Sequence, residues 1–273
     1  AVGESDTQIF TRTLLDTDAN PLVNTATVDA NPVGLANDIT DEDSCEVTRQ
    51  GNTFCSVTQG YWGNAGGKKC GGQTTTELLN ALLGFGDVVV GVPGRSITFD
   101  TAECIILRLP AGGTPSALPV NLGDPNCRVL PASLVKKNKP EINNVLVGQV
   151  VTLTLNVRLG LLPCLSNNET DDLLGLFVIP EGPFCTIPVA DEDGCPKQVD
   201  VGGFVGLRVD ELLAIANQAL GGVDVSPYTI GGINSAVTAI NEGFDECRQV
   251  VDCPEAEICD NGCDDDFDGE VDE

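Results

Sequence analysis

The residues best suited to chemistry lie near the C-terminal end of the sequence, where carboxylates recur at alternate positions. Asp264, Asp266 and Asp268 precede Gly269, and Asp272 follows. Calcium takes about six to eight oxygen ligands, which alternate carboxylates of a tight loop can supply while glycine allows the sharp bend. No soft ligand stands among these oxygens, which favours calcium over zinc or copper. The spacing predicts a calcium site with the ligands Asp264, Asp266, Asp268, Glu270 and Asp272, and with Asp260 as an extra ligand.

A solvated acidic tail is the alternative interpretation, because most runs of charge are solvated. Such a tail would need neither Gly269 nor the neighbouring cysteines. The stretch Glu257–Asp272 also resembles the EICDNGIDDDGDG-type metal-binding motif of secreted and surface proteins of bacteria, Bacteroidetes among them. Cys263 stands where that motif has Ile, and Phe267 stands where it has Gly. The resemblance implies a bacterial extracellular protein and implies no reaction.

A second resemblance lies at Thr58–Asn64, which reads Thr-Gln-Gly-Tyr-Trp-Gly-Asn. It is similar to the TQGYWKNH motif of bacterial surface proteins, although Gly63 replaces the usual Lys and the His is absent. That family implies no function. The structural expectation for Tyr61 and Trp62 is that they anchor a core poor in aromatic residues.

The resemblance also bears on Val145–Val157, whose apolar residues fit both a strand and one face of a helix. In proteins with the TQGYWKNH motif, short helices follow it, and residues 148–156 look like their helical segment. The resemblance therefore favours a helix where periodicity alone leaves both possibilities open.

The twelve cysteines predict disulfides. Zinc sites are typically built from Cys-x2-Cys pairs or histidines, and this sequence contains neither. The cytosol keeps thiols reduced, so we expect all twelve cysteines to pair in an oxidising compartment. The spacing does not determine which cysteine pairs with which.

The balance of charge excludes several classes of partner. The sequence has 41 acidic and 14 basic residues, for a net charge of −27. Such a surface repels nucleic acid and anionic membranes and favours cations. No apolar run reaches the roughly 18 residues that a membrane span needs. The sequence opens without Met or an apolar leader, so we expect an extracellular or cell-surface protein whose signal peptide has been removed.

The sequence contains no histidine, and this argues against an enzyme. Histidine is the most common general base and the usual partner of a nucleophilic Ser or Cys. Paired carboxylates leave a glycosidase formally possible. The single Trp and two Tyr, however, offer few platforms for sugar rings. We therefore expect no enzymatic activity.

The local patterns predict an α+β fold, a disulfide-stapled mixed domain with short helices and strands. Thr74 and Glu77 form a capping box that starts a helix ending at Gly84. Further expected elements are helices at Asp210–Leu220 and Asn234–Cys247, strands at Val88–Val92 and Ser96–Phe99, and an acidic loop at Asp38–Asp43. The expected domains are an extended N-terminal segment (1–44), a disulfide-rich α+β domain (45–250) and an acidic calcium-binding tail (251–273).

The N-terminal segment suggests how the protein could assemble. Thr7–Leu15 reads as a strand with apolar residues on both faces. Such a strand can add to the open sheet edge of a neighbouring subunit, or it can pair within its own chain. We therefore expect a secreted calcium-binding structural protein that forms a homopolymer by strand donation, as a surface layer or filament. The alternative is an adhesive module that recognises a glycan or a protein.

Overall fold

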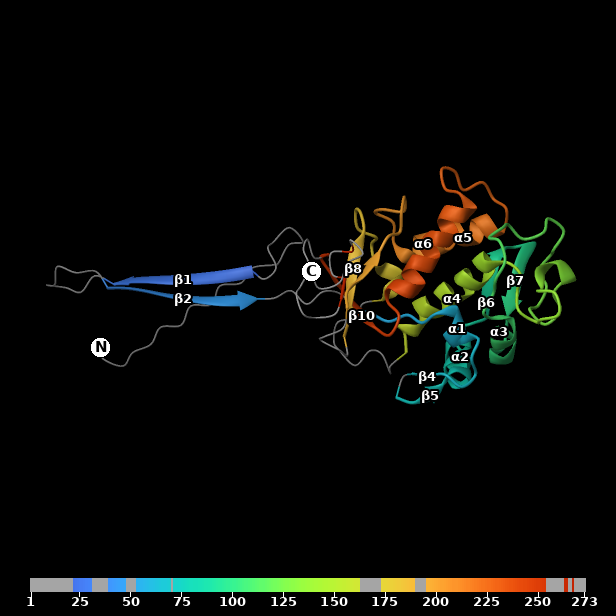
Figure 1. Ribbon diagram of the computed structural model, residues 1–273, viewed down its shortest axis with the longest axis horizontal. Coiled ribbons are helices and arrows are strands. Elements are labelled where there is room, and N and C mark those ends of the chain that lie inside the picture. The colour runs from blue at the N-terminus through green and yellow to red at the C-terminus, as the bar shows by residue number, and fades with distance from the viewer. Residues whose placement is uncertain are drawn as a thin grey trace. The chain divides into compact units, whose positions relative to one another are not determined.

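The computed structural model describes residues 22–30, 39–47, 53–69, 71–162, 173–189 and 195–253, together with residues 263, 264 and 267. The chain divides into two units, residues 1–51 and residues 52–273. Helices and short sheets both occur, so the α+β class predicted from the sequence is confirmed (Figure 1).

The described part of the first unit is a β-hairpin. Strand β1 (Leu22–Ala30) runs antiparallel to β2 (Ile39–Val47), with Leu22 opposite Val47 and Ala30 opposite Ile39. The acidic loop predicted at Asp38–Asp43 is therefore wrong, because Ile39 and the residues after it belong to β2. The backbone of these acidic residues pairs with β1, whose Thr and Val side chains favour a strand. The strand predicted at Thr7–Leu15 lies outside the described residues.

The second unit is organised around α4 (Val145–Leu159), none of whose residues is exposed. In Figure 1, α4 lies among α1 (Gln59–Trp62), α2 (Thr75–Leu83), α5 (Val209–Leu220) and α6 (Ile230–Gly243). A helix that is buried on every side carries apolar residues all round it, so its sequence has no single apolar face. This explains why periodicity left Val145–Val157 open, and the expectation of a helix is confirmed.

The other two long helices begin and end at identifiable signals. α5 starts one residue before the predicted Asp210, and the carboxylate of Glu211 accepts a hydrogen bond from the backbone nitrogen of Arg208 at 2.8 Å. α6 was predicted at Asn234–Cys247, and both bounds are wrong. It begins at Ile230 because Thr229 caps it. It ends at Gly243, and the backbone is left-handed at Glu246 and Cys247, within the predicted range.

The capping box predicted for α2 is confirmed in both directions. The Thr74 hydroxyl accepts from the backbone nitrogen of Glu77 at 3.3 Å, and the Glu77 carboxylate accepts from the backbone nitrogen of Thr74 at 2.7 Å. The bond that the carboxylate accepts from the Thr74 backbone nitrogen, together with one that it accepts from the Thr74 hydroxyl, lowers the pKa of Glu77. α3 (Ala102–Arg108) was not predicted, although the Thr101 hydroxyl caps it by accepting from the backbone nitrogen of Cys104.

Small sheets flank the helices. The predicted strands are found as the hairpin of β6 (Val88–Val92) and β7 (Arg95–Phe99). A four-stranded sheet has the order β3 (Thr53–Phe54), β10 (Arg248–Val251), β8 (Phe184–Pro188) and β9 (Lys197–Val199). The remaining elements are the pair β4 (Lys68–Lys69) and β5 (Gln73–Thr74), and two 3-10 turns at Ala132–Leu134 and Leu174–Leu176.

Eight cysteines form four disulfides in the described part of the chain, which confirms the prediction for those eight. The pairs are Cys55–Cys247, Cys104–Cys127, Cys185–Cys253 and Cys195–Cys263. Two of them span 68 positions and one spans 192, so they join distant parts of the sequence. Such bonds fit a secreted or extracellular protein. None of the described helices is long and apolar enough to cross a membrane.

Candidate functional site

The predicted calcium site is described at only one of its ligands. Asp264 follows Cys263, which is buried and bonded to Cys195 in the segment before β9. The other predicted ligands lie outside the described residues; they are Asp260, Asp266, Asp268, Glu270 and Asp272. The disulfide therefore fixes the beginning of the predicted calcium loop to the folded unit, and the calcium site stays a prediction.

Phe267 has a backbone conformation that is unusual for its side chain. Its φ is +62°, in the left-handed region that glycine adopts freely and other residues at a cost. This is the position at which the resembling bacterial motif carries glycine. The turn is therefore one that a glycine at position 267 would form with less strain.

The described residues offer no second metal site. Within them, no three side chains of Asp, Glu or Cys come close enough together to hold an ion.

The Thr58–Asn64 motif is explained by contacts in the core. The Thr58 side chain caps α1, and Trp62 is completely buried with its indole nitrogen 3.2 Å from Oδ1 of Asn156 on α4. The Asn156 side-chain nitrogen donates to the Val57 carbonyl at 3.0 Å and to Oδ1 of Asn241 on α6 at 2.9 Å. This network confirms the structural role expected for Trp62 and ties three helices together.

Gln59 and two glycines contribute to the same packing of the Thr58–Asn64 motif in the core. The Gln59 side-chain carbonyl accepts from the backbone nitrogen of Ala111 at 3.0 Å and lies against Gly148 of α4, where a β-carbon would collide with it. At Gly63 a β-carbon would come within 2.6 Å of the Leu109 carbonyl oxygen. The two segments that carry the TQGYWKNH resemblance therefore contact each other directly, and their unusual residues serve packing.

A small charged cluster lies near the Cys55–Cys247 disulfide. Lys69 donates to the Ser56 carbonyl at 3.3 Å, and burial lowers the pKa of its ammonium group although Asp245 and Glu246 oppose that shift. Burial likewise raises the pKa of Asp245, with Lys69 acting against it. Partial loss of hydration is therefore the largest cause of both pKa shifts.

A basic region that the sequence analysis missed lies in the segment after α3. Residues 128–139 contain four of the 14 basic residues and no acidic residue. In a chain with 41 acidic residues, a basic stretch without any acid is the sequence signal that could have revealed this region. The four basic residues are Arg128, Lys136, Lys137 and Lys139.

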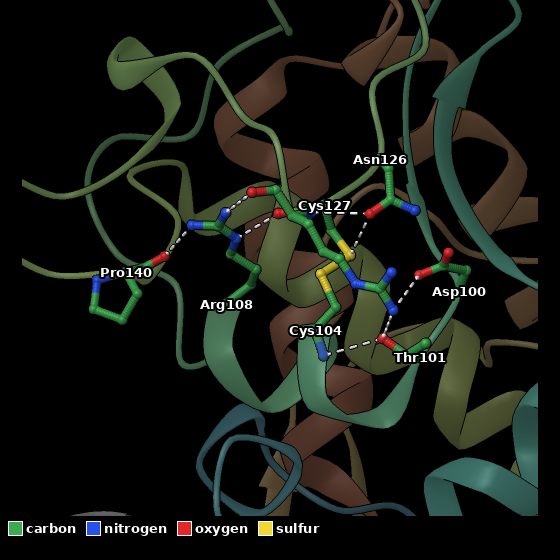
Figure 2. The surroundings of a disulfide bond; sticks show 8 residues. Asp100, Thr101, Cys104, Arg108, Asn126, Cys127 and Pro140 are labelled. Carbon is green, nitrogen blue, oxygen red and sulfur yellow. Dashed lines mark hydrogen bonds and ion pairs between the residues drawn. A yellow bond between two sulfur atoms is a disulfide. The ribbon is translucent and has the colours of Figure 1, made fainter.

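The Arg108 side chain of α3 anchors residues 128–139 through hydrogen bonds. Figure 2 shows its guanidinium reaching from α3 to backbone carbonyls, at 2.6 Å from Cys127, 2.6 Å from Pro140 and 3.1 Å from Arg128. Its side chain is only 6 % exposed. The Cys104–Cys127 disulfide fixes the start of the segment to the same helix. The segment is thus anchored by one covalent bond and three hydrogen bonds that involve a charged group.

Two adjoining hollows open along the anchored segment, and we name them together the basic groove. One has a volume of about 700 Å³ and is lined by residues that include Arg108, Asn143, Lys136 and Lys137. The other has a volume of about 540 Å³, and Val120, Leu122 and Val129 are among its lining residues. Leu130 and Ser133 line both hollows. The groove therefore combines a basic half with an apolar half.

Comparisons of the chain with models of protein families, with curated proteins and with solved structures found no match.

Proposed function

We propose that this chain is a secreted, calcium-binding structural protein that assembles with copies of itself outside the cell. The observation that carries the proposal is the exposure of the β1–β2 hairpin. Thr25, Ala26 and Thr27 are consecutive, so they belong to both faces of the strand, and all three are exposed. Val23 is exposed over 54 % of its surface.

The outer edges of the hairpin favour pairing with a further strand. Within the described residues, β1 and β2 pair only with each other. A lone two-stranded hairpin is marginally stable in water, and its outer edges carry unpaired backbone groups. Addition of such an edge to a sheet of another copy supplies backbone hydrogen bonds, and a head-to-tail contact of this kind continues into a filament. Strand donation by Thr7–Leu15 would act by the same chemistry.

The disulfides support the proposed extracellular location. The carboxylates of the acidic tail support the proposed binding of calcium. Cys195–Cys263 secures the start of the predicted calcium loop, and we expect calcium to be bound by Asp264, Asp266, Asp268, Glu270 and Asp272. Titration calorimetry tests this assignment. Asp266→Ala together with Asp268→Ala should abolish calcium uptake, whereas unchanged uptake would refute the ligand set. We assign no catalytic role to the chain.

An adhesive module is the second candidate, and the basic groove is the observation that favours it. A groove with a basic and an apolar half could hold part of a protein receptor or an acidic glycan. The two candidates differ in one outcome, since only the structural protein requires copies of the chain to associate with each other.

Sedimentation velocity of the full chain over a range of concentrations tests the proposed assembly. Lysines on an exposed strand oppose edge-to-edge pairing, so Thr25→Lys with Thr27→Lys should weaken association at least tenfold. The control is Asn80→Lys with Leu107→Lys, two exposed helix positions that add the same charge. Equal association of both variants and the wild type would count against the hairpin.

A further inference from the structure

We infer that the basic groove is the receiving site for strand β2 of a second copy of this chain. The inference rests on the proposed self-assembly and names the surface on which it occurs. It is carried by the anchoring of the groove, by its unpaired lysines, by its exposed valines and by the composition of β2.

The groove is held in its open shape before any partner arrives. Arg108 and the Cys104–Cys127 disulfide secure one end of the segment. At the other end, the backbone nitrogen of Lys136 donates to the Glu141 carbonyl at 2.9 Å, and the Asn143 nitrogen donates to the Leu134 carbonyl at 2.9 Å. A site that is already ordered loses less conformational entropy on binding, which raises affinity.

The lysines of the groove have no carboxylate partner within the described part of their own chain. Lys136 and Lys137 line the groove, and Lys139 follows them in the anchored segment. Among the described residues these three lysines take part in no ion pair, whereas Arg128 lies 3.7 Å from Asp100. Lys136 donates to the Pro110 carbonyl at 2.9 Å, and Lys137 and Lys139 are exposed. On a protein with a net charge of −27, unpaired cations beside an apolar hollow favour an anionic partner.

The apolar half of the groove calls for a partner with apolar side chains as well. Val120 and Val129 are 76 % and 77 % exposed. Both line the smaller hollow, beside the half-buried Leu122 and Leu130. Covering these two side chains would remove apolar surface from water, which favours association.

Strand β2 has the composition that this groove requires. Ile39–Val47 carries four acids and no base, and it is bounded by the apolar residues Ile39 and Val47. The acidic tail is the competing segment, but its carboxylates are the proposed calcium ligands and bound calcium would neutralise them. A second copy that inserts β2 therefore satisfies the lysines and the valines together.

Sedimentation velocity of full-length variants tests the groove separately from the hairpin. Lys137→Glu with Lys139→Glu should weaken association at least tenfold. The matched control is Lys68→Glu with Lys197→Glu, which changes the net charge equally at exposed positions outside the groove and should change association less than twofold. Circular dichroism and the urea midpoint of each variant confirm that the chain is folded.

Exchanging the charges of β2 and of the groove then tests whether β2 occupies the groove. Asp41→Lys with Asp43→Lys should also weaken association, and mixing this variant with Lys137→Glu/Lys139→Glu should restore it. No restoration, or equal losses in the groove variant and its control, would overturn the assignment of β2. Normal association of the groove variant, combined with loss in Thr25→Lys/Thr27→Lys, would overturn the groove and leave the proposed function standing. A wild-type chain that stays monomeric would overturn both, and binding of polygalacturonate through the same lysines by such a monomer would indicate the adhesive alternative.

Discussion

The indole nitrogen of Trp62 donates a hydrogen bond to Oδ1 of Asn156, a residue 94 positions later, at 3.2 Å. The same oxygen accepts from the backbone nitrogen of Val57 at 3.1 Å. Both residues are completely buried, so no water can replace either bond. One amide side chain therefore joins the Thr58–Asn64 motif to the central helix.

Replacement of Asn156 by Ala should destabilise the protein by roughly 3 kcal/mol or more. It would leave the Trp62 indole and the polar groups of Val57 buried without partners, at about 1–3 kcal/mol for each group. Thr154→Ala on the same helix is the control, because the Thr154 hydroxyl bonds only within α4, to the Val150 carbonyl. Urea unfolding without reductant measures both. Equal midpoints for the two variants would mean that the network contributes little.

Two glycines in helices should respond in opposite directions to replacement by Ala. At Gly148 the new β-carbon would collide with the Gln59 side chain and would stand 2.5 Å from the Ala111 β-carbon. Overpacking of this kind costs roughly 1–3 kcal/mol. At Gly231 nothing lies within 4 Å, so Ala should stabilise α6 by up to about 1 kcal/mol. Thermal unfolding of both variants tests the two expectations. A stabilising effect of Gly148→Ala would contradict the close contact of Gly148 with Gln59 and Ala111.

Replacement of Phe267 by Gly should favour the turn of the acidic tail. Relief of the left-handed strain at φ +62° is expected to contribute about 1–2 kcal/mol. If calcium requires this turn, its affinity should rise by up to roughly tenfold. Titration calorimetry compares Phe267→Gly with Phe267→Ala, which keeps the strain. Weaker calcium binding by the glycine variant would show that the Phe267 side chain itself assists the site.

The remaining cysteines should also be paired. Cys45, Cys70, Cys164 and Cys259 are the four beyond the disulfides of the described residues. In an oxidising compartment we expect no free thiol among them. Intact mass before and after reduction should differ by about two mass units for each disulfide. Alkylation of several cysteines in the native, unreduced protein would disprove complete pairing.

Sequence reasoning succeeded where the signal is local. The capping box of Thr74 and Glu77, the helix ending at Leu220 and the strand Val88–Val92 each depend on a few neighbouring residues. The helix at Val145–Leu159 could not be derived from periodicity, because burial on all sides removes the amphipathic pattern. There, only the resemblance indicated the helix.

Sequence reasoning failed where tertiary contacts decide the structure. Asp41 lies in a strand because the opposite strand pairs with its backbone, and the acidic composition gives no sign of that partner. The basic groove depends on contacts between Arg108 and carbonyls up to 32 positions away, which no spacing rule predicts. The predicted calcium loop is the reverse case, because its local pattern is strong but Asp264 is the one predicted ligand among the described residues.

Electron microscopy of the purified full chain, with calcium and after its removal by a chelator, tests self-assembly most directly. We predict ordered polymers of the wild-type chain in calcium. Without calcium the polymers should be fewer or shorter, and they should return when calcium is restored. The Thr25→Lys/Thr27→Lys variant should give single particles in both conditions. Separate particles of one chain for the wild type in calcium, at concentrations where the protein is folded, would contradict self-assembly.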